Sequence, residues 1–263
     1  MGRIRSLRTL ILSCSLLSCR RAVWDPPAGD RSSGEIPVIS ARRVPTGGVR
    51  LDGHLDEVSW KTAGDTGGFV DPGTGRPEPR SRVKGAARVG WDDRYLYLAF
   101  VIGDGDPVTP FRADEVDPHL WERSSAVEVM IQPGDPGNNS HYYELQVDPA
   151  GAVWDTRFDD YNQPITASPD GARRFGHQEW SSRVQKGIVI DRAAGRYTIE
   201  LALPWGAFES PNANAPPREG DVWRMNFYSF RDGQQDALAW SPTLGQGNFH
   251  RSARFGRVRF DPR

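Results

Sequence analysis

Cysteine is nearly absent from this chain. Its 263 residues include only two cysteines, Cys14 and Cys19, both close to the N-terminus. The region after them can therefore contain no disulfide, no thiolate metal site and no cysteine nucleophile. Long apolar runs are absent as well, and a transmembrane helix needs about 20 consecutive apolar residues. The sequence therefore predicts no membrane-spanning helix.

The sequence also lacks an excess of positive charge and the common catalytic motifs. The formal net charge is −1, so we expect no nucleic-acid partner. The five histidines form no HxH, HxxxH or HExxH pattern, and no GxSxG, P-loop or GxGxxG motif occurs. A metal-hydrolase site therefore has no local support. A glycosidase pair stays open, because carboxylates are plentiful but nothing singles out two of them.

The N-terminus has the pattern of an export signal. Three arginines precede a short apolar stretch that ends in the letters LLSC, with Cys19 last. These letters resemble a bacterial lipobox, in which the cysteine is lipidated. We predict a lipoprotein signal peptide over 1–18, lipidation of Cys19, and an exported protein anchored in the outer membrane, since arginine follows the cysteine. The alternative is an ordinary cleaved signal with an unmodified cysteine.

Composition divides the rest of the chain into a linker and one domain. Residues 20 to about 36 are rich in proline, glycine, serine and charge, which predicts a flexible tether over 19–35. Residues 36–263 are expected to form a single domain. The chain's 28 glycines and 21 prolines are typical of many short strands joined by turns, and its nine tryptophans can fill a core.

Strand signals recur throughout this domain. Alternating segments at 88–91 and 95–102 flank a turn and predict a hairpin, as do 182–190 and 196–203. A single helical turn is expected at 204–208, because proline suits a first helical position. Many strands without βαβ spacing predict an all-β, antiparallel β-sandwich of the immunoglobulin-like or jelly-roll type. Further strands are expected at 126–131, 143–147, 152–158, 223–230 and 255–260.

Two aromatic residues stand outside the strand pattern. Trp121 follows the polar loop DPHL, and Phe249 lies in the glycine-rich segment TLGQGNFHR. Exposed rings on loops favour a role in binding. A pyranose offers C–H groups to the face of a ring, so two rings beside carboxylate and amide groups could clamp a sugar. The alternative is that both rings fill gaps between the sheets.

Calcium is the second ligand class that the sequence allows. Acidic residues cluster in 52–57 and again in 104–117, and hard cations need several such oxygens. The spacing matches no EF-hand, and turn-forming aspartates explain the clusters equally well. We therefore expect no required cofactor, with Ca²⁺ as an option. The acids concerned are Asp52, Asp56, Glu57, Asp104, Asp106, Asp114 and Asp117.

An ordered set of motifs resembles the family 9 carbohydrate-binding modules, and the similarity covers nearly all of residues 36–263. This resemblance implies a β-sandwich, often with bound calcium, that holds sugars between two aromatic rings. In the best-known branch of the family the ligands are the reducing ends of glycans. The motifs are LDGHLDEVSW, VGWDDRYLYLAFVIGD, LWERSSAVEVMI, YYELQVDPAGAVWD, WRMNFYSF and AWSPTLGQGNFHRSARFGRVRF.

The resemblance also implies which residues would contact the sugar. Trp121 matches the first clamp tryptophan, and Phe249 stands where the second would be. Glu128 matches an acidic residue of the neighbouring strand. Gln146 and Asp148 stand where that branch has arginine and asparagine. Loss of the arginine removes a rigid fork of donors, and phenylalanine offers a smaller ring.

We therefore predict non-catalytic glycan binding by a membrane-anchored, exported β-sandwich, with carbohydrate and the membrane as partners and a monomeric state. Two alternatives remain. A glycoside hydrolase in the same fold would need a pocket with two converging carboxylates, one with a raised pKa. A structural or partner-binding domain of an outer-membrane complex would need a large exposed apolar patch.

Overall fold

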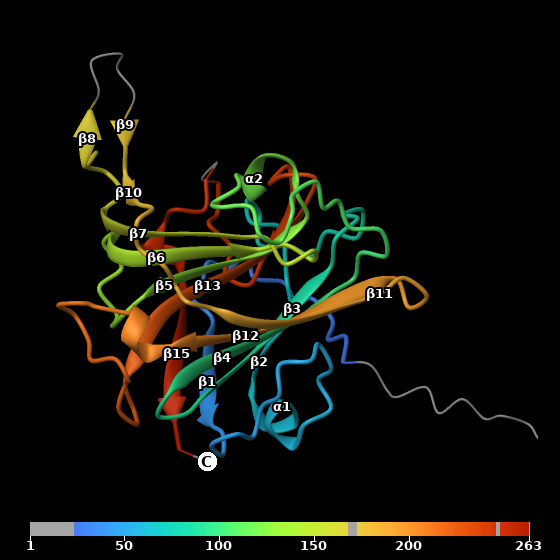
Figure 1. The fold of residues 1–263 in the computed structure, drawn as a ribbon, viewed down its shortest axis with the longest axis horizontal. Helices are drawn as coiled ribbons and strands as arrows, with labels where there is room; N and C mark the ends of the chain where they lie inside the picture. Colours follow the sequence, from blue (N-terminus) through green and yellow to red (C-terminus); the bar gives the residue numbers. More distant parts are fainter. Residues whose placement is uncertain (1–23, 168–172, 246–247, 263) are drawn as a thin grey trace, which may run out of the picture.

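Strands dominate the computed structural model, which describes residues 24–167, 173–245 and 248–262 (Figure 1). The predicted signal peptide, 1–18, and Cys19 lie outside the described residues. The helical turns are α1 (Val58–Thr62), α2 (Leu120–Arg123), η1 (Trp205–Ala207) and η2 (Ser252–Arg254). The strands are β1 (Val38–Arg43), β2 (Gly64–Gly68), β3 (Gly85–Trp91), β4 (Tyr95–Ile102), β5 (Ala126–Gln132), β6 (Ser140–Val147), β7 (Val153–Asp160), β8 (Thr166–Ala167), β9 (Arg173–Arg174), β10 (Gly176–His177), β11 (Gln185–Asp191), β12 (Arg196–Pro204), β13 (Val222–Arg231), β14 (Asp236–Ala239) and β15 (Gly256–Asp261).

One continuous hydrogen-bonded path folds into two layers. The strand order is β10-β7-β6-β5-β13-β15-β1-β3-β4-β12-β11, and its two halves lie one above the other in Figure 1. Apolar residues of both halves form the main core, where the rings of Phe100 and Phe227 meet edge to face with centroids 5.9 Å apart. The predicted β-sandwich is therefore confirmed.

The direction of one strand differs from the purely antiparallel prediction. β1 runs parallel to both of its neighbours, β15 and β3, so the sheet is mixed. Its register pairs Ile39 with Val258 and Arg42 with Gly90. Side-chain alternation reveals a strand but not its direction, and the parallel pairing joins segments from opposite ends of the chain.

The local predictions agree well with the observed elements. Both predicted hairpins form, as β3–β4 and β11–β12, and the helical turn forms at Trp205–Ala207. On β5, Val127, Val129 and Ile131 enter the main core, as expected from their alternation. Glu128 and Met130 consequently point to the outer face of this layer.

The segment predicted as a flexible tether is partly bound to the domain. The Trp24 indole donates a 2.6 Å hydrogen bond to Asp65, and the ring lies under the guanidinium of Arg88 at 4.1 Å. The guanidinium of Arg31 donates to the carbonyls of Thr66 and Gly68, both at 2.8 Å. From Trp24 onward the chain is therefore attached to β2 and β3, whereas residues 19–23 lie outside the described residues.

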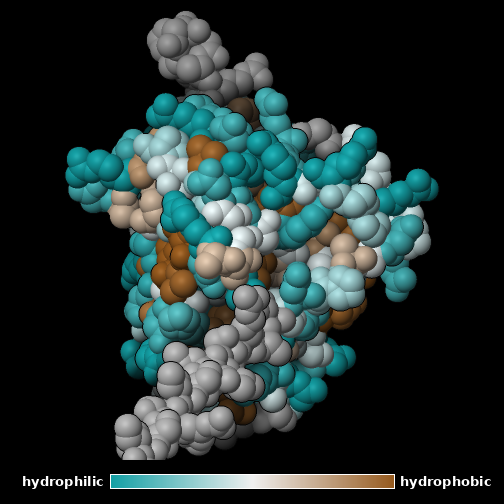
Figure 2. All heavy atoms as spheres, turned by 90° about the vertical axis from the view of Figure 1, so that its right-hand side faces the viewer, coloured by the Kyte–Doolittle hydropathy of each residue, from teal (hydrophilic) through white to brown (hydrophobic). Residues whose placement is uncertain are grey.

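The partner-binding alternative requires a large exposed apolar patch, so the distribution of apolar residues on the surface is relevant to it. In Figure 2, which views the right-hand side of Figure 1, hydrophobic residues form separate small areas among hydrophilic ones. The large exposed apolar side chains of the described residues, Val38, Val58 and Val116, lie on β1, on α1 and in the loop before α2. Apolar residues scattered in this way are ordinary for a monomer. None of the helices in the described ranges is long and apolar enough to cross a bilayer.

Candidate ligand-binding site

Polar side chains gather on the outer face of the layer formed by β13, β5, β6 and β7. Strand register aligns them in two adjacent rows across the four strands, because alternate residues share a face. The first, which we call the glutamate row, consists of Tyr228, Glu128, Gln146 and Trp154. The second row consists of Asn226, Met130, Glu144 and Thr156.

An amide links the acids of the two rows. The Gln146 Nε2 group donates to Glu128 Oε2 at 3.0 Å and to Glu144 Oε1 at 2.8 Å. Glu128 Oε2 also accepts a 2.7 Å hydrogen bond from the Gln234 amide. Glu128, Glu144 and Gln146 are all buried, with 0%, 3% and 0% exposure. The result is a buried pair of carboxyl groups that accept hydrogen bonds from the same amide nitrogen.

Burial changes the protonation of this pair. Burial raises the pKa of Glu144 to about 8. The pKa of Glu128 is raised well above its usual range, mainly by burial and to a smaller extent by the nearby charge of Glu144. The neighbouring imidazole of His250, whose Nε2 lies 3.7 Å from Glu144 Oε2, has its pKa lowered to about 3 by burial and is therefore neutral. The pair thus faces a neutral ring instead of a cation.

Several buried polar atoms of these two rows have no hydrogen-bond partner among the described residues. Burying such an atom without a partner costs about 1–3 kcal/mol, and native proteins contain few of them. The described residues contain fifteen such atoms, and five of them lie together on three neighbouring strands, which is the arrangement expected where a ligand supplies the missing partners. The atoms are Glu128 Oε1, Glu144 Oε2, Gln146 Oε1, Trp154 Nε1 and Thr156 Oγ1.

The two aromatic residues singled out in the sequence lie at opposite ends of the glutamate row. Trp121, on α2, is partly exposed and meets Trp154 edge to face at 4.6 Å. Phe249 stacks on Tyr228 at 4.0 Å with an interplanar angle of 7°. Three strand spacings, roughly 14 Å, separate β13 from β7. Neither ring belongs to the main core between the layers, but Phe249 is buried in a second hydrophobic cluster with Tyr228, and Trp121 packs against a third that contains Trp154.

The rows are covered in this structure. Phe249 is only 7% exposed, and the Tyr142 hydroxyl lies 2.7 Å from His250 Nδ1. Gln234 lies over Glu128, and its backbone N–H donates to the Trp121 carbonyl at 3.2 Å. The structure therefore places the two rings around a covered polar row and not beside an open slot.

Asp148 has a different position from the other predicted residues. Its Oδ1 accepts from the Ala152 N–H at 2.8 Å and its Oδ2 from the Ser124 hydroxyl at 3.2 Å. Both oxygens thus hold the turn between β6 and β7 and the segment after α2. Glu128 and Gln146 lie together in the row, Trp121 and Phe249 flank it, and Asp148 supports it from the side.

Sequence reasoning missed four members of this site. Glu144 was visible in principle, because in YYELQVD it alternates with Gln146 and must share its face. Trp154 and Thr156 belong to the site because the register of β6 and β7 places them beside Gln146 and Glu144. Gln234 belongs to it because its loop brings the side chain to Glu128. No local pattern carries that information.

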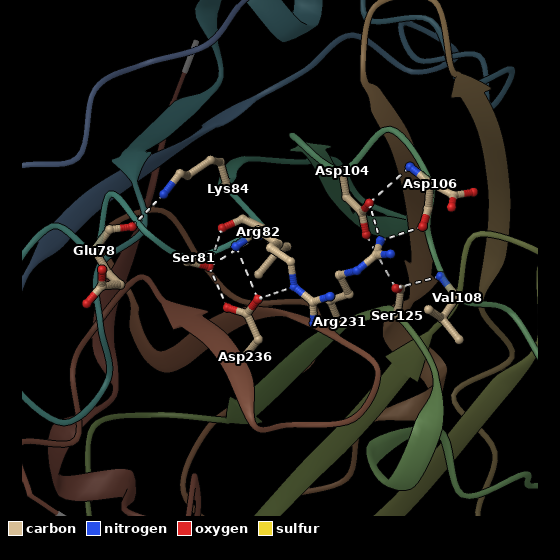
Figure 3. Close-up of polar contacts among 11 residues, drawn as sticks. Glu78, Ser81, Arg82, Lys84, Asp104, Asp106, Val108, Ser125, Arg231 and Asp236 are labelled. Carbon is tan, nitrogen blue, oxygen red and sulfur yellow. Dashed lines mark hydrogen bonds and ion pairs between the residues drawn. The ribbon is translucent and has the colours of Figure 1, made fainter.

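Three of the acids considered for calcium, Asp104, Asp114 and Asp52, pair with arginines. Figure 3 shows the Arg231 guanidinium between Asp104 and the Asp106 carbonyl, donating to both. Ser125 adds a 3.4 Å hydrogen bond to Asp104. The cationic Arg231 side chain thus occupies an Asp104 oxygen and the Asp106 carbonyl. Asp114 pairs similarly with Arg112 and Asp52 with Arg50. Within the described ranges, no group of three or more His, Cys, Asp or Glu side chains is arranged to hold a metal ion.

The fold and these residues define a β-sandwich that carries a buried polar row and flanking aromatic rings on the outer face of one layer. The family follows from the sequence: the model of the carbohydrate family 9 binding domain-like family matches residues 51–261, and the chain belongs to that family. A search of curated proteins finds no match.

Solved structures share the fold. A family 9 carbohydrate-binding module from Caldicellulosiruptor kristjanssonii in complex with cellotriose matches with a TM-score of 0.55 and 12% identity, over 86% of this chain and 94% of that one. A family 9 module from the same organism in complex with glucose matches with a TM-score of 0.53 and 13% identity, over 86% of this chain and 96% of that one. A protein from Bacteroides uniformis ATCC 8492, described as a candidate carbohydrate-binding protein, gives 0.64 and 19%, over 86% and 100%. At these identities the likeness concerns the fold alone.

Proposed function

We propose that this protein binds carbohydrate without catalysis, with the glutamate row as the floor of the site and Trp121 and Phe249 at its ends. The observation that carries the proposal is the concentration of five unpartnered polar atoms in two rows between these rings. Sugar hydroxyls both donate and accept, so one ligand could pair with all of them. Fold relatives described as complexes with cellotriose and glucose support the ligand class.

Binding would be modest in strength and slow to begin. Small polar ligands gain limited free energy from their contacts, and part of it offsets the loss of translational and rotational freedom on binding. Phe249, His250 and Gln234 cover the rows, so a sugar reaches them only after these side chains move. Association rates fall below the diffusional value when binding needs such a change.

The experiment is calorimetric titration of the full chain with glucose, cellotriose and other short oligosaccharides. Trp121→Ala should abolish binding while leaving the thermal midpoint nearly unchanged, because this ring is partly exposed. Trp24→Ala is the matched control, since Trp24 is also partly exposed but stacks on Arg88 on the other layer. A large loss of stability in Trp121→Ala, or unchanged binding, would count against the proposal.

Glycoside hydrolysis is the second candidate, because Glu128 and Glu144 are the two converging carboxyl groups that it needs. A glycosidase requires environments that separate the two pKa values into one acid and one carboxylate. Here burial raises the pKa of both, and both accept from the same amide. Binding is therefore favoured. Release of new reducing ends from cellotriose, lost in Glu144→Gln, would reverse this preference.

The membrane anchor is also proposed, on the strength of the lipobox-like letters that end at Cys19. An acylated cysteine would hold the domain at the outer membrane of the cell without any spanning helix. Metabolic labelling with a palmitate analogue should mark the protein, and Cys19→Ser should remove the label. Labelling that persists in this variant would exclude Cys19 as the modified residue.

A further inference from the structure

A groove of about 1000 Å³ lies on the outer face of the other layer, opposite the glutamate row. Strand register places Val101, Thr198 and Val189 side by side across β4, β12 and β11, and these residues form its floor. The partly exposed Trp24 ring and the loop at 53–56 contribute to its walls. Its volume is in the range of about 300–1,000 Å³ that is typical of small-molecule sites.

Three cations of this groove lack a close acidic partner. Arg88 lines it from β3; its buried Nε has no hydrogen-bond partner among the described residues, and Asp65 Oδ2 lies 3.7 Å away. Arg196, on β12, lies 3.9 Å from Asp191 Oδ2. Lys61, on α1, is exposed and forms no ion pair within the part of the chain that the structure describes. These side chains therefore have donors available for a ligand in the groove.

The acidic residues that line the groove are engaged within the protein. Asp191 Oδ1 accepts a hydrogen bond from the Ala194 N–H at 2.9 Å, and Asp56 Oδ1 lies 3.8 Å from the Arg50 guanidinium. The exposed imidazole of His54 adds a further nitrogen to the lining. A surplus of cationic donors over available acceptors favours an anionic ligand over a neutral sugar or a metal ion.

The arrangement of the cations suits a phosphate better than a carboxylate. They come from three separate elements, α1, β3 and β12. A phosphate ester offers three terminal oxygens and close to two negative charges, whereas a carboxylate has two oxygens and one charge. The Trp24 ring lies 4.1 Å from the Arg88 guanidinium and fixes its plane, so Arg88 can present a rigid fork of donors. The valine floor gives hydrocarbon a surface to cover beside the phosphate.

We propose that this groove binds the headgroup of an anionic phospholipid, with the phosphate held by Lys61 and Arg88 and the first methylene groups on the valine floor. A soluble phosphate ester would pair with the same cations but would leave the apolar floor exposed to water. Trp24 is also close in the chain to Cys19, the residue proposed above to be lipidated. The inference does not depend on carbohydrate binding, because it concerns the opposite layer.

The test is flotation of the full chain with vesicles of phosphatidylcholine alone and of phosphatidylcholine mixed with phosphatidic acid. The Cys19→Ser variant is used, so that no acyl anchor contributes. The protein should bind the mixed vesicles at least about tenfold more tightly than phosphatidylcholine alone. Added salt should weaken this binding, because it screens the charges. Calorimetry with glycerol phosphate tests the soluble source and should show binding at least about tenfold weaker than that of the mixed vesicles.

Three further substitutions separate the groove from general surface charge. Lys61→Gln should weaken binding to the mixed vesicles by about fivefold, the contribution of one basic residue near an anionic surface. Arg88→Gln should weaken it by at least about tenfold, because it also removes the fork of donors. Lys186→Gln is the matched control: Lys186 is exposed on β11, but its side chain reaches Gly151 in the turn between β6 and β7 and does not line the groove. Thermal melts verify that all three variants fold.

Several outcomes would overturn the inference. Equal binding to both kinds of vesicle, or binding to neither, would exclude recognition of the anionic headgroup. An equal loss in Lys186→Gln and Lys61→Gln would mean that surface charge attracts the vesicles without a defined site. Glycerol phosphate that binds as tightly as the mixed vesicles would assign the groove to a soluble phosphate ester and not to a lipid.

The lipid and sugar proposals fail separately. Trp24→Ala should weaken vesicle binding, because it removes the ring that holds Arg88, and should leave sugar affinity unchanged. Trp121→Ala should abolish sugar binding and leave vesicle binding unchanged, since Trp121 lies beside the glutamate row. Loss of both kinds of binding in Trp24→Ala would contradict the assignment of the groove to lipid alone.

Discussion

Both outer faces of the sandwich bury glutamate, and they treat it differently. On the layer of β12, Glu200 is fully buried and its carboxylate is saturated: it accepts from the N–H groups of Asp52 at 2.9 Å and Gly53 at 2.6 Å, and from the Trp60 indole at 2.7 Å. On the opposite layer, Glu128 and Glu144 share one amide donor, and each keeps an unpartnered oxygen.

This contrast shows that burial of a glutamate does not by itself indicate a binding function. Burial raises the pKa of Glu200 to about 7 and the pKa of Glu144 to about 8. A raised pKa therefore does not distinguish the two faces. What differs between Glu200 and the Glu128–Glu144 pair is the supply of hydrogen-bond partners, although Glu57, near Glu200, also has two buried oxygens without a hydrogen-bond partner. Glu200 has a structural role, because it ties the loop at 52–53 and α1 to β12. The unsatisfied oxygens of the other pair are the feature that points to a ligand.

The largest expected effect is on stability, from Glu200→Ala. Removing this carboxylate leaves the Trp60 indole and two backbone N–H groups without their acceptor, which should lower the free energy of unfolding by about 3 kcal/mol. Urea denaturation followed by tryptophan fluorescence measures it. Glu200→Gln retains an acceptor and should lose less. A loss below about 1 kcal/mol would mean that the two faces do not differ in this way.

The next effect is on binding, from Glu128→Gln. This change replaces a buried carboxyl group that already has an unpartnered oxygen with an amide of similar size, so stability should stay within about 1 kcal/mol of wild type. Affinity for a bound sugar should fall about tenfold, which corresponds to one hydrogen bond between a sugar hydroxyl and the carboxyl group. Calorimetry and urea denaturation on the same sample give both numbers. A stability loss as large as that of Glu200→Ala would assign Glu128 a structural role too.

A smaller effect is expected in the pH dependence of stability. A carboxyl group with a raised folded-state pKa binds its proton more tightly in the folded protein, so its contribution to stability is fully present below the unfolded value of 4.5 and is lost as pH rises towards about 8 for Glu144. The thermal midpoint should therefore fall across this interval, and fall less in Glu144→Gln. Parallel curves for the two proteins would contradict the burial of a titrating group here.

The smallest effect is expected from an exposed ion pair beside the Glu200 loop. Arg50 pairs with Asp52, but its side chain is 69% exposed. Exposed pairs contribute little, because water and salt screen them. Arg50→Ala should change neither the thermal midpoint nor sugar affinity by a measurable amount. A clear loss of stability would show that the loop above Glu200 depends on this pair.

The sequence predicted what is encoded locally. The alternation of Val127, Val129 and Ile131 identified the inner face of β5 and thereby placed Glu128 outside it. Turn residues located both hairpins. The parallel direction of β1 and the attachment of Trp24 could not be predicted, because both depend on segments distant in the chain. Within the site, Glu144 follows from alternation, but the meeting of Trp121 with Trp154 requires the register of β6 and β7.

The contact of Trp24 with β3 has a consequence for orientation. Arg88, which covers the Trp24 ring, lies on the outer face opposite the glutamate row. Were Cys19 lipidated, the five residues from there to Trp24 would span at most about 17 Å. The domain would then rest close to the lipid headgroups on its β3 side. The opposite side, which carries the glutamate row, would then face away from the membrane.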